Sequence, residues 1–579
     1  MSLGEAAAGG ASSTPGRRLR LLPWAPLLTI LAMLAPVAFG LGGTLLPALG
    51  WLPALGGHGI GLDAFRDLVA WPGFPRAATL SLTTGFAATA VSLALVCLVC
   101  AGWQGTRAFT FVQRALSPLL SVPHAAAAFG IAFLVAPSGW IARALSPWLT
   151  GWERPPDLLI VQDPYGLAMI AGLVAKEVPF LLLMTLSALG QVRSGQSVMV
   201  AQALGHRRTT AWLKIVLPQV YVQIRLPVYA VLAYSMSVVD VAIILGPNTP
   251  PTLSVQVVRW MSDPDLAFRF QAAAGAVAQL ALVVAGLAVW RLLEFAAARA
   301  GRRWIERGGR GCGDAALRAA GLAAAILVSL AIGLGIAGLA VWSVAGFWTF
   351  PNLLPDSLTW RGWARHGPEI LSAASETVII AGAATSIALF LTLASLEAEH
   401  RHGLRPTRRA LWLLYIPLIV PQVAFLTGLQ TLALSTGLAG GRVAVILAHL
   451  VFVLPYVFLS LSAPWRAWDA RHATVARALG SGPDRVLWRV RLPMLLRPIL
   501  VAAAVGFAVS VGQYLPTLLV GAGRVETLTT EAVALAAGGD RRIIGAYALA
   551  QTAAAFLPFA VAILLPRLLW RNRKGLGHV

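Results

Sequence analysis

The sequence predicts an all-α polytopic membrane protein of about 12 transmembrane helices, arranged as two similar six-helix halves. Of its 579 residues, 58% are hydrophobic and only 12% are charged, and the mean hydropathy is +0.75. These values lie far from those of soluble domains. Apolar runs of about 20 residues, the length that crosses a hydrocarbon core, recur along the whole chain. A loop motif also occurs twice, 275 positions apart, which indicates an internal duplication.

Twelve apolar runs are long enough to span a bilayer as helices. They cover residues 22–46, 78–102, 115–137, 165–190, 226–246, 267–293, 319–346, 376–396, 410–436, 443–463, 497–520 and 543–566. Three arginines precede the first run, which is longer than the apolar region of a typical cleavable signal. We therefore interpret it as a retained transmembrane helix.

The basic residues are distributed unequally between the loops. With the N-terminus placed in the cytoplasm, the loops on that side hold 32 of the 45 Lys and Arg residues, and the outer loops hold 12. The positive-inside rule then predicts a multi-pass protein of the bacterial inner membrane with both termini in the cytoplasm. The net charge of +22 faces the anionic headgroups of the lipid bilayer, so we expect no nucleic-acid partner.

The repeated motif reads VAQALG at Val200–Gly205 and VARALG at Val475–Gly480. At the same distance each copy is followed by an aliphatic residue, one further position and Leu-Pro. Each copy precedes the last two spans of its half. We therefore predict a first permeation half at 1–300, with its loop near 191–225, and a second half at 301–579, with its loop near 464–497.

Each copy predicts a short helix that ends at a glycine in the left-handed conformation, Gly205 or Gly480. A second short helix should follow, and the Leu-Pro pairs at 217–218 and 492–493 should break it before the next span. An amphipathic elbow without a partner would explain one such loop. Two copies of the same loop favour a docking role for both.

The pattern A-x-x-L-G-x9-[IV]-x-L-P before the last two spans of a six-span core resembles the loop of permease subunits of ATP-binding-cassette importers. The double length resembles the fused permeases of the ferric-iron and thiamine uptake class, and implies thiamine or ferric iron as the substrate. The resemblance implies an ATPase-coupling role for matching residues in both loops: Ala201, Leu204, Gly205, Ile215, Leu217, Pro218, Ala476, Leu479, Gly480, Val490, Leu492 and Pro493.

One departure from the family pattern concerns the loop glutamate. Met199 and Thr474 stand where that family has the acid. An ion pair from this position to an ATPase cannot form, so docking would depend on shape and on nearby arginines, namely Arg207, Arg208, Arg477 and Arg485.

The chain itself has no sequence for ATP hydrolysis. None of its three lysines follows the G-x-x-x-x-G pattern that cradles phosphate, so we predict a transport subunit that is not an enzyme and binds no cofactor. The resemblance implies that ATP is bound by a partner, two copies of a cytoplasmic ATP-binding subunit. It also implies a periplasmic substrate-binding protein.

Three charged residues fall within predicted spans: Lys176, Glu177 and Asp240. Ionisable groups in the membrane are costly and mark either a polar lock between helices or a translocation path. Both interpretations remain open from the sequence, and an ion pair between Lys176 and Asp240 is one form of the lock. The second half has only His449 and Gln513 at roughly corresponding places.

Two other classes of function are compatible with such a chain. A secondary transporter also has two six-span halves and could use Glu177 or Asp240 as a proton carrier, but the loop after the second span lacks the G-x-x-x-D-R sequence of that class. A membrane-embedded enzyme would need a ligand cluster, and the nearest one is His400-Arg401-His402. Its position beside Glu397 and Glu399 is more typical of a solvated face.

Overall fold

The computed structural model describes residues 22–116, 118–311, 313–404, 408–435, 437 and 440–569. In these ranges nearly all regular structure is helical, which confirms the predicted all-α class. One short antiparallel ribbon, β1 (Trp51–Leu52) with β2 (Gly57–His58), follows the first helix. Within the described residues, ten helices are long and apolar enough to cross a membrane, and the number rises to 12 if two bent helix pairs each count as one span.

The helices before the connector at residues 307–313 are α1 (Ala25–Ala48), α2 (Asp63–Ala70), α3 (Phe74–Trp103), α4 (Arg107–Leu116), α5 (His124–Val135), α6 (Trp140–Leu145), α7 (Leu167–Leu189), α8 (Ser194–Ala203), α9 (Arg208–Ala211), α10 (Leu217–Ser237), α11 (Asp240–Leu245), α12 (Leu253–Met261) and α13 (Phe268–Glu306).

The helices after the connector are α14 (Asp314–Ser343), α15 (Arg361–His402), α16 (Arg408–Ile419), α17 (Gln422–Ser435), α18 (Arg442–Ala467), α19 (Arg471–Ala478), α20 (Pro483–Val486), α21 (Leu492–Met494), α22 (Leu496–Val511), α23 (Leu515–Gly521), α24 (Leu528–Ala534) and α25 (Arg541–Leu569).

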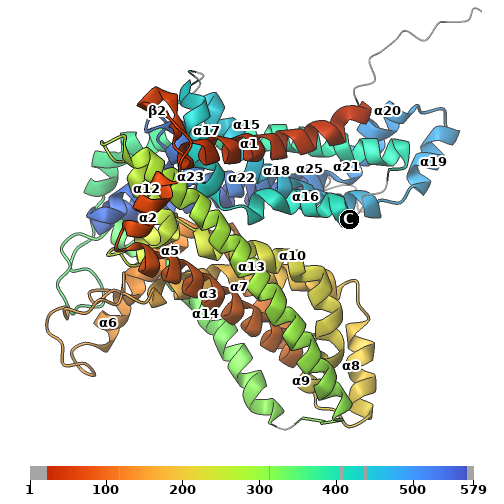
Figure 1. Cartoon of the computed structure of the whole chain (residues 1–579). Coiled ribbons are helices and arrows are strands. Elements are labelled where there is room, and N and C mark those ends of the chain that lie inside the picture. The colour runs from red at the N-terminus through yellow and green to blue at the C-terminus, as the bar shows by residue number, and fades with distance from the viewer. Residues whose placement is uncertain are drawn as a thin grey trace, which may run out of the picture.

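In Figure 1 the helices form two bundles, one that carries α8 and α9 (the N-terminal bundle) and one that carries α19 and α20 (the C-terminal bundle). The first α-helix of the described residues, α1, packs on the C-terminal bundle, and the first helix after the connector, α14, packs on the N-terminal bundle. Helix α1 lies along α17 and α15, whereas α14 lies along α5 and α3 (Figure 1). Both crossings depend on glycine. A Cβ on Gly130 of α5 or Gly335 of α14 would lie within 3 Å of the other's backbone, and a Cβ on Gly43 of α1 would lie 2.7 Å from the carbonyl oxygen of Gly428. Small residues allow this approach because no side chain separates the backbones.

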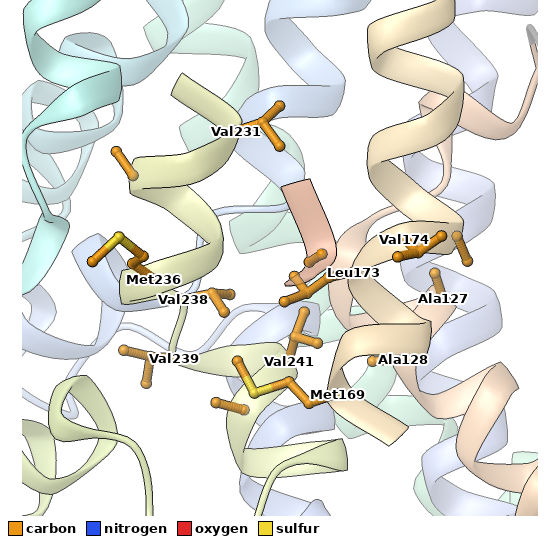
Figure 2. Packing of buried hydrophobic residues seen from close by; sticks show 14 of the residues in the cluster. Ala127, Ala128, Met169, Leu173, Val174, Val231, Met236, Val238, Val239 and Val241 are labelled. Atoms are coloured by element: carbon orange, nitrogen blue, oxygen red, sulfur yellow. The ribbon is translucent and has the colours of Figure 1, made fainter. Parts of the chain in front are cut away.

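Several predicted spans are not continuous helices. The run at 410–436 bends by 82° between α16 and α17, and the run at 115–137 contains the end of α4 and the whole of α5. Two further runs break near their C-terminal ends. The run at 226–246 is broken after Ser237, where Val238 has an extended backbone, and α11 restarts at Asp240. The run at 497–520 is broken between α22 and α23, at residues 512–514. Hydropathy is continuous across both breaks, so an apolar count could not find them. Figure 2 shows Val238 and Val239 at the break, with Val241 beyond it facing Met169 and Leu173 of α7.

The two bundles are in contact at one end and diverge toward the other (Figure 1). The diverging end carries α8 and α9 on one bundle and α19 and α20 on the other, and we call it the loop end. The opposite end carries the β1–β2 ribbon, α2, α6 and α12. The two copies of the repeated motif therefore lie at the same end of the molecule but on separate bundles.

Candidate functional site

The first paired loop, residues 194–218, consists of α8, Gly205, α9 and a π-helical turn at Trp212–Val216. Gly205 has φ +87°, as the sequence predicts. The N–H of Gly205 donates to the carbonyl oxygen of Gln202 at 2.9 Å, and the N–H of His206 donates to that of Ala201 at 3.0 Å. This pair of bonds is the Schellman motif, which closes a helix at a left-handed residue.

The second paired loop, residues 471–493, repeats this geometry bond for bond. Gly480 has φ +80° at the end of α19. Its N–H donates to the carbonyl oxygen of Arg477 at 2.9 Å, and the N–H of Ser481 donates to that of Ala476 at 3.0 Å. Helix α20 and a π-helical turn at Leu487–Arg491 follow. The two motifs therefore encode one local structure twice.

The prediction that Leu217-Pro218 interrupts the helix is wrong. Helix α9, the π-helical turn and α10 form one run from Arg208 to Ser237. A proline lacks its N–H and its ring would press on the preceding turn of an α-helix. The wider π-turn directly before Pro218 removes this conflict. In the second loop the chain does bend, by 73°, but only after Met494, beyond Leu492 and Pro493.

Each paired loop exposes several apolar side chains, and a leucine is the most exposed of them in each loop; they are Met199, Val200 and Leu204 in the first loop and Val475, Leu479 and Trp488 in the second. Leu204 is 65% exposed and Leu479 is 81% exposed, whereas Ala201 is buried. Of the remaining motif residues, Ile215, Leu217, Ala476, Val490, Leu492 and Pro493 are half-buried and anchor the loops, whereas Gly205, Pro218 and Gly480 are exposed. The motif thus separates into an anchored base and a protruding leucine on each bundle.

The connector between α13 and α14 holds the first loop in place. Lys214 donates from Nζ to the carbonyl oxygen of Gly309 at 2.7 Å, and the Asp314 carboxylate accepts the N–H of Thr209 at 3.2 Å. Asp314 therefore caps the start of α9 from another helix, since no side chain within the loop does so. At the base, Trp212 donates from Nε1 to Gln104 Oε1 at 2.9 Å.

An ion-pair network, buried at Glu397 and Arg491, holds the second loop. Arg491 donates to Glu397 at 3.1 Å, and Arg401 donates to Glu397 at 2.7 Å and to Asp484 at 2.8 Å. The Arg491 guanidinium also stacks on Trp465 and Trp468, 4.3 and 4.8 Å from the ring centroids. The solvated face expected around His400 is wrong at Glu397, which is buried. Sequence reasoning missed this network because its partners lie 94 positions apart.

Lys176 does not pair with Asp240. Its Nζ donates to the carbonyl oxygens of Val122 at 2.6 Å and Leu119 at 2.9 Å, just before α5 begins. Carbonyl groups at the end of a helical turn carry partial negative charge, so a lysine there completes their hydrogen bonds. Lys176 thus fixes the start of α5, whose first residue is His124.

Glu177 and Asp240 lie in one polar cluster. The Glu177 Oε1 atom is 3.8 Å from His124 Nε2, and the His124 ring is 5.0 Å from the ring of Tyr234. Tyr234 lies within electrostatic range of both carboxylates. Two further tyrosines come from the C-terminal bundle, Tyr456 near Glu177 and Tyr514 near Asp240. We call His124, Glu177, Tyr234, Asp240, Tyr456 and Tyr514 the carboxylate–tyrosine cluster.

His449 and Gln513, which stand at roughly corresponding places after the connector, carry no carboxylate or ammonium group. His449 bonds through Nδ1 to Ser510 Oγ at 2.8 Å and through Nε2 to Thr517 Oγ1 at 2.9 Å. Both ring nitrogens are therefore used inside the bundle, where the side chain is buried. Gln513 is half-buried beside the break before α23. The carboxylate–tyrosine cluster thus takes its carboxylates from α7 and α11, before the connector, and Tyr456 and Tyr514 from the chain after the connector.

Several known proteins resemble this chain. Residues 391–572 match the family described as binding-protein-dependent transport system inner membrane component. Over 567 residues the chain is 35% identical to the inner membrane ABC transporter permease protein YnjC of Escherichia coli K12, with 97% of this chain and 100% of that protein covered.

Two shorter matches cover about a quarter of this chain each. The chain is 30% identical over 179 residues to the molybdenum transport system permease protein ModB of Mycobacterium bovis, covering 27% of this chain and 66% of that protein. It is 25% identical over 160 residues to the spermidine/putrescine transport system permease protein PotC of Haemophilus influenzae, covering 26% and 62%.

Proposed function

This chain belongs to the family of inner membrane components of binding-protein-dependent ABC transporters, and from that premise we propose that it is a fused, double-length permease whose two paired loops couple to a separate ATPase. Its relatives are transport subunits, which argues against an ion-gradient transporter or a membrane enzyme. We propose residues 1–300 and 301–579 as its two permeation halves.

The observation that carries the coupling role is the duplicated loop geometry. Both loops have the same Schellman closure, the same left-handed glycine and one protruding leucine, at the same end of the molecule. A protruding apolar side chain on a compact, anchored loop suits a groove on a partner protein. Because the loops lie on separate bundles, each would engage its own ATP-binding subunit, so we propose two copies. ATP binds to those subunits, and this chain needs no cofactor.

The orientation follows from the same assignment. ATP is available in the cytoplasm, so we propose that the loop end faces the cytoplasm and that both termini are cytoplasmic. This agrees with the excess of basic residues in the loops of that side. The opposite end then faces the periplasm and receives the substrate from a binding protein. For the substrate we propose thiamine or ferric iron, the class that the fused length and the loop motif resemble.

Docking can be tested by placing a charge on each protruding leucine. We expect Leu204→Asp and Leu479→Asp each to remove about one of two ATPase copies that co-purify from native membranes, because a carboxylate cannot enter an apolar groove without losing its hydration. The double variant should purify without ATPase. Mass spectrometry of the intact complex counts the copies and identifies the P-loop subunit.

Leu159→Asp is the matched control, since Leu159 is 73% exposed at the opposite end. It should retain both ATPase copies. Retention of both copies by the double loop variant would show that the paired loops are not the docking sites.

A further inference from the structure

The carboxylate–tyrosine cluster contains two buried acids that have no lysine or arginine partner among the described residues. Glu177 is 4% exposed and Asp240 is 7% exposed. Within the described ranges, neither carboxylate forms an ion pair with a lysine or arginine, and the nearest cationic candidate is His124 at 3.8 Å from Glu177. Unpaired carboxylates inside a membrane protein are costly, so a site that keeps two of them suggests a mobile positive partner.

The nearest fixed cation does not supply that partner. Lys176 is the neighbour of Glu177 in sequence, but its Nζ is bound to the carbonyl oxygens of Leu119 and Val122. Successive residues of a helix point about 100° apart, so one residue can secure α5 while the next faces the cluster. The lysine is thus committed to the backbone, and the excess charge of the cluster is negative.

The cluster also has an aromatic wall from both bundles. Tyr234 belongs to α10 and Tyr456 to α18, and the two lie within electrostatic range of each other. Aromatic faces attract cations through the ring quadrupole, and the attraction is stronger where water is displaced. The side chain of His124 is 36% exposed, whereas that of Glu177 is 6% exposed. His124 therefore forms the accessible edge of the cluster.

We propose that the carboxylate–tyrosine cluster is the intramembrane binding site of the transporter and that it takes an organic cation. Glu177 and Asp240 balance the charge, and Tyr234 and Tyr456 receive the cationic group between the two bundles. A bare metal ion fits less well, because among the described residues no group of three or more His, Cys, Asp and Glu side chains is placed to hold one. The proposal rests on the permease function and favours an organic cation over ferric iron.

The site can be tested by ligand-induced thermal stabilisation of the purified full-length chain in lipid nanodiscs. Thiamine and spermidine serve as organic-cation probes and molybdate as an oxyanion probe, at matched ionic strength. We expect the two cations to raise Tm and molybdate to leave it unchanged. Glu177→Gln and Asp240→Asn should each weaken the apparent affinity for the cations about tenfold or more, because a buried charge loses its partner.

Tyr456 provides a test that does not alter the charge. Tyr456→Phe keeps the aromatic face and should bind the cations as the wild type does, whereas Tyr456→Leu removes the face and should weaken binding about threefold to tenfold. Glu294→Gln is the control. That carboxylate is also buried but is paired with Arg291 at 2.6 Å and Arg225 at 3.2 Å, away from the cluster. Its variant should keep the full ligand-induced shift.

Stabilisation by molybdate equal to that by the cations, or no stabilisation by either cation, would overturn the proposal. So would full cation shifts in Glu177→Gln and Asp240→Asn, or, if those variants do not fold, equal binding by Tyr456→Phe and Tyr456→Leu. The measurement contains neither ATPase nor nucleotide. Cation binding without ATPase docking would therefore contradict only the coupling role, and docking without cation binding would contradict only the site.

Discussion

The N–H of Arg207 donates a 3.0 Å hydrogen bond to the carbonyl oxygen of Arg310, and so joins the first paired loop to the connector between α13 and α14. In the described residues, the second loop has no corresponding connector to bond to. It is secured by the ion pair between Glu397 and Arg491 instead. Two loops of the same local geometry are therefore held by different long-range contacts. Variants that loosen one loop should leave the other unaffected.

Asp314 and Asp484 form a matched pair for this expectation. Asp314→Asn weakens the cap on Thr209 and should loosen only the first loop, at a cost of about 1 kcal/mol. Asp484→Asn removes the carboxylate that binds Arg401 and should loosen only the second. Hydrogen exchange followed by mass spectrometry measures protection at 194–216 and 471–491 separately. Equal loss of protection in both loops from either variant would contradict independent support.

The left-handed glycines should be sensitive to substitution. Gly205→Val and Gly480→Val force a β-branched residue to positive φ, which costs about 1–3 kcal/mol. Gly205→Val should be the more harmful, because a Cβ there lies 3.3 Å from the Arg310 side chain while that at Gly480 meets open space. Both should lower substrate-stimulated ATP hydrolysis in reconstituted membranes. Gly195→Ala, within α8 and facing open space, is the control; wild-type stimulation in both valine variants would refute the prediction.

Lys176 should contribute to stability independently of Asp240. Lys176→Met leaves the carbonyl groups of Leu119 and Val122 without their donor and should lower the free energy of unfolding by about 2–4 kcal/mol. Exchanging the charges, Lys176→Asp with Asp240→Lys, should give no recovery over the single variants. Differential scanning fluorimetry in detergent measures both effects. Recovery in the double variant would show an ion pair that the structure does not contain.

The buried pair Glu397–Arg491 should matter more than an exposed pair. Their side chains are 7% and 4% exposed, so Glu397→Gln leaves a buried guanidinium without its counter-charge and should cost about 3–5 kcal/mol. Glu376→Gln breaks the pair with Arg442, whose side chain is 54% exposed, and should cost about 1 kcal/mol or less. Thermal unfolding compares the two. Similar losses in both variants would contradict the role assigned to burial.

Much of the local structure could be predicted from the sequence. The spans follow from runs of apolar residues, because a hydrocarbon core selects for them locally. The left-handed conformations of Gly205 and Gly480 follow from a helix that must close within a short loop. The repetition of the motif predicted two loops of one geometry. Each of these properties depends on residues that are neighbours in the chain.

The sequence by itself thus determined the all-α membrane class and the duplicated loop, while tertiary structure decided which distant groups meet. Hydropathy does not distinguish the helix that α1 packs against, whereas tertiary contacts such as the close approach of Gly43 and Gly428 identify it as α17. Lys176 lies beside Glu177 in sequence, yet the backbone carbonyl groups just before α5 accept its hydrogen bonds, and the acids are left to the tyrosines. Partner choice depends on the packing of whole bundles, which no local pattern of residues records.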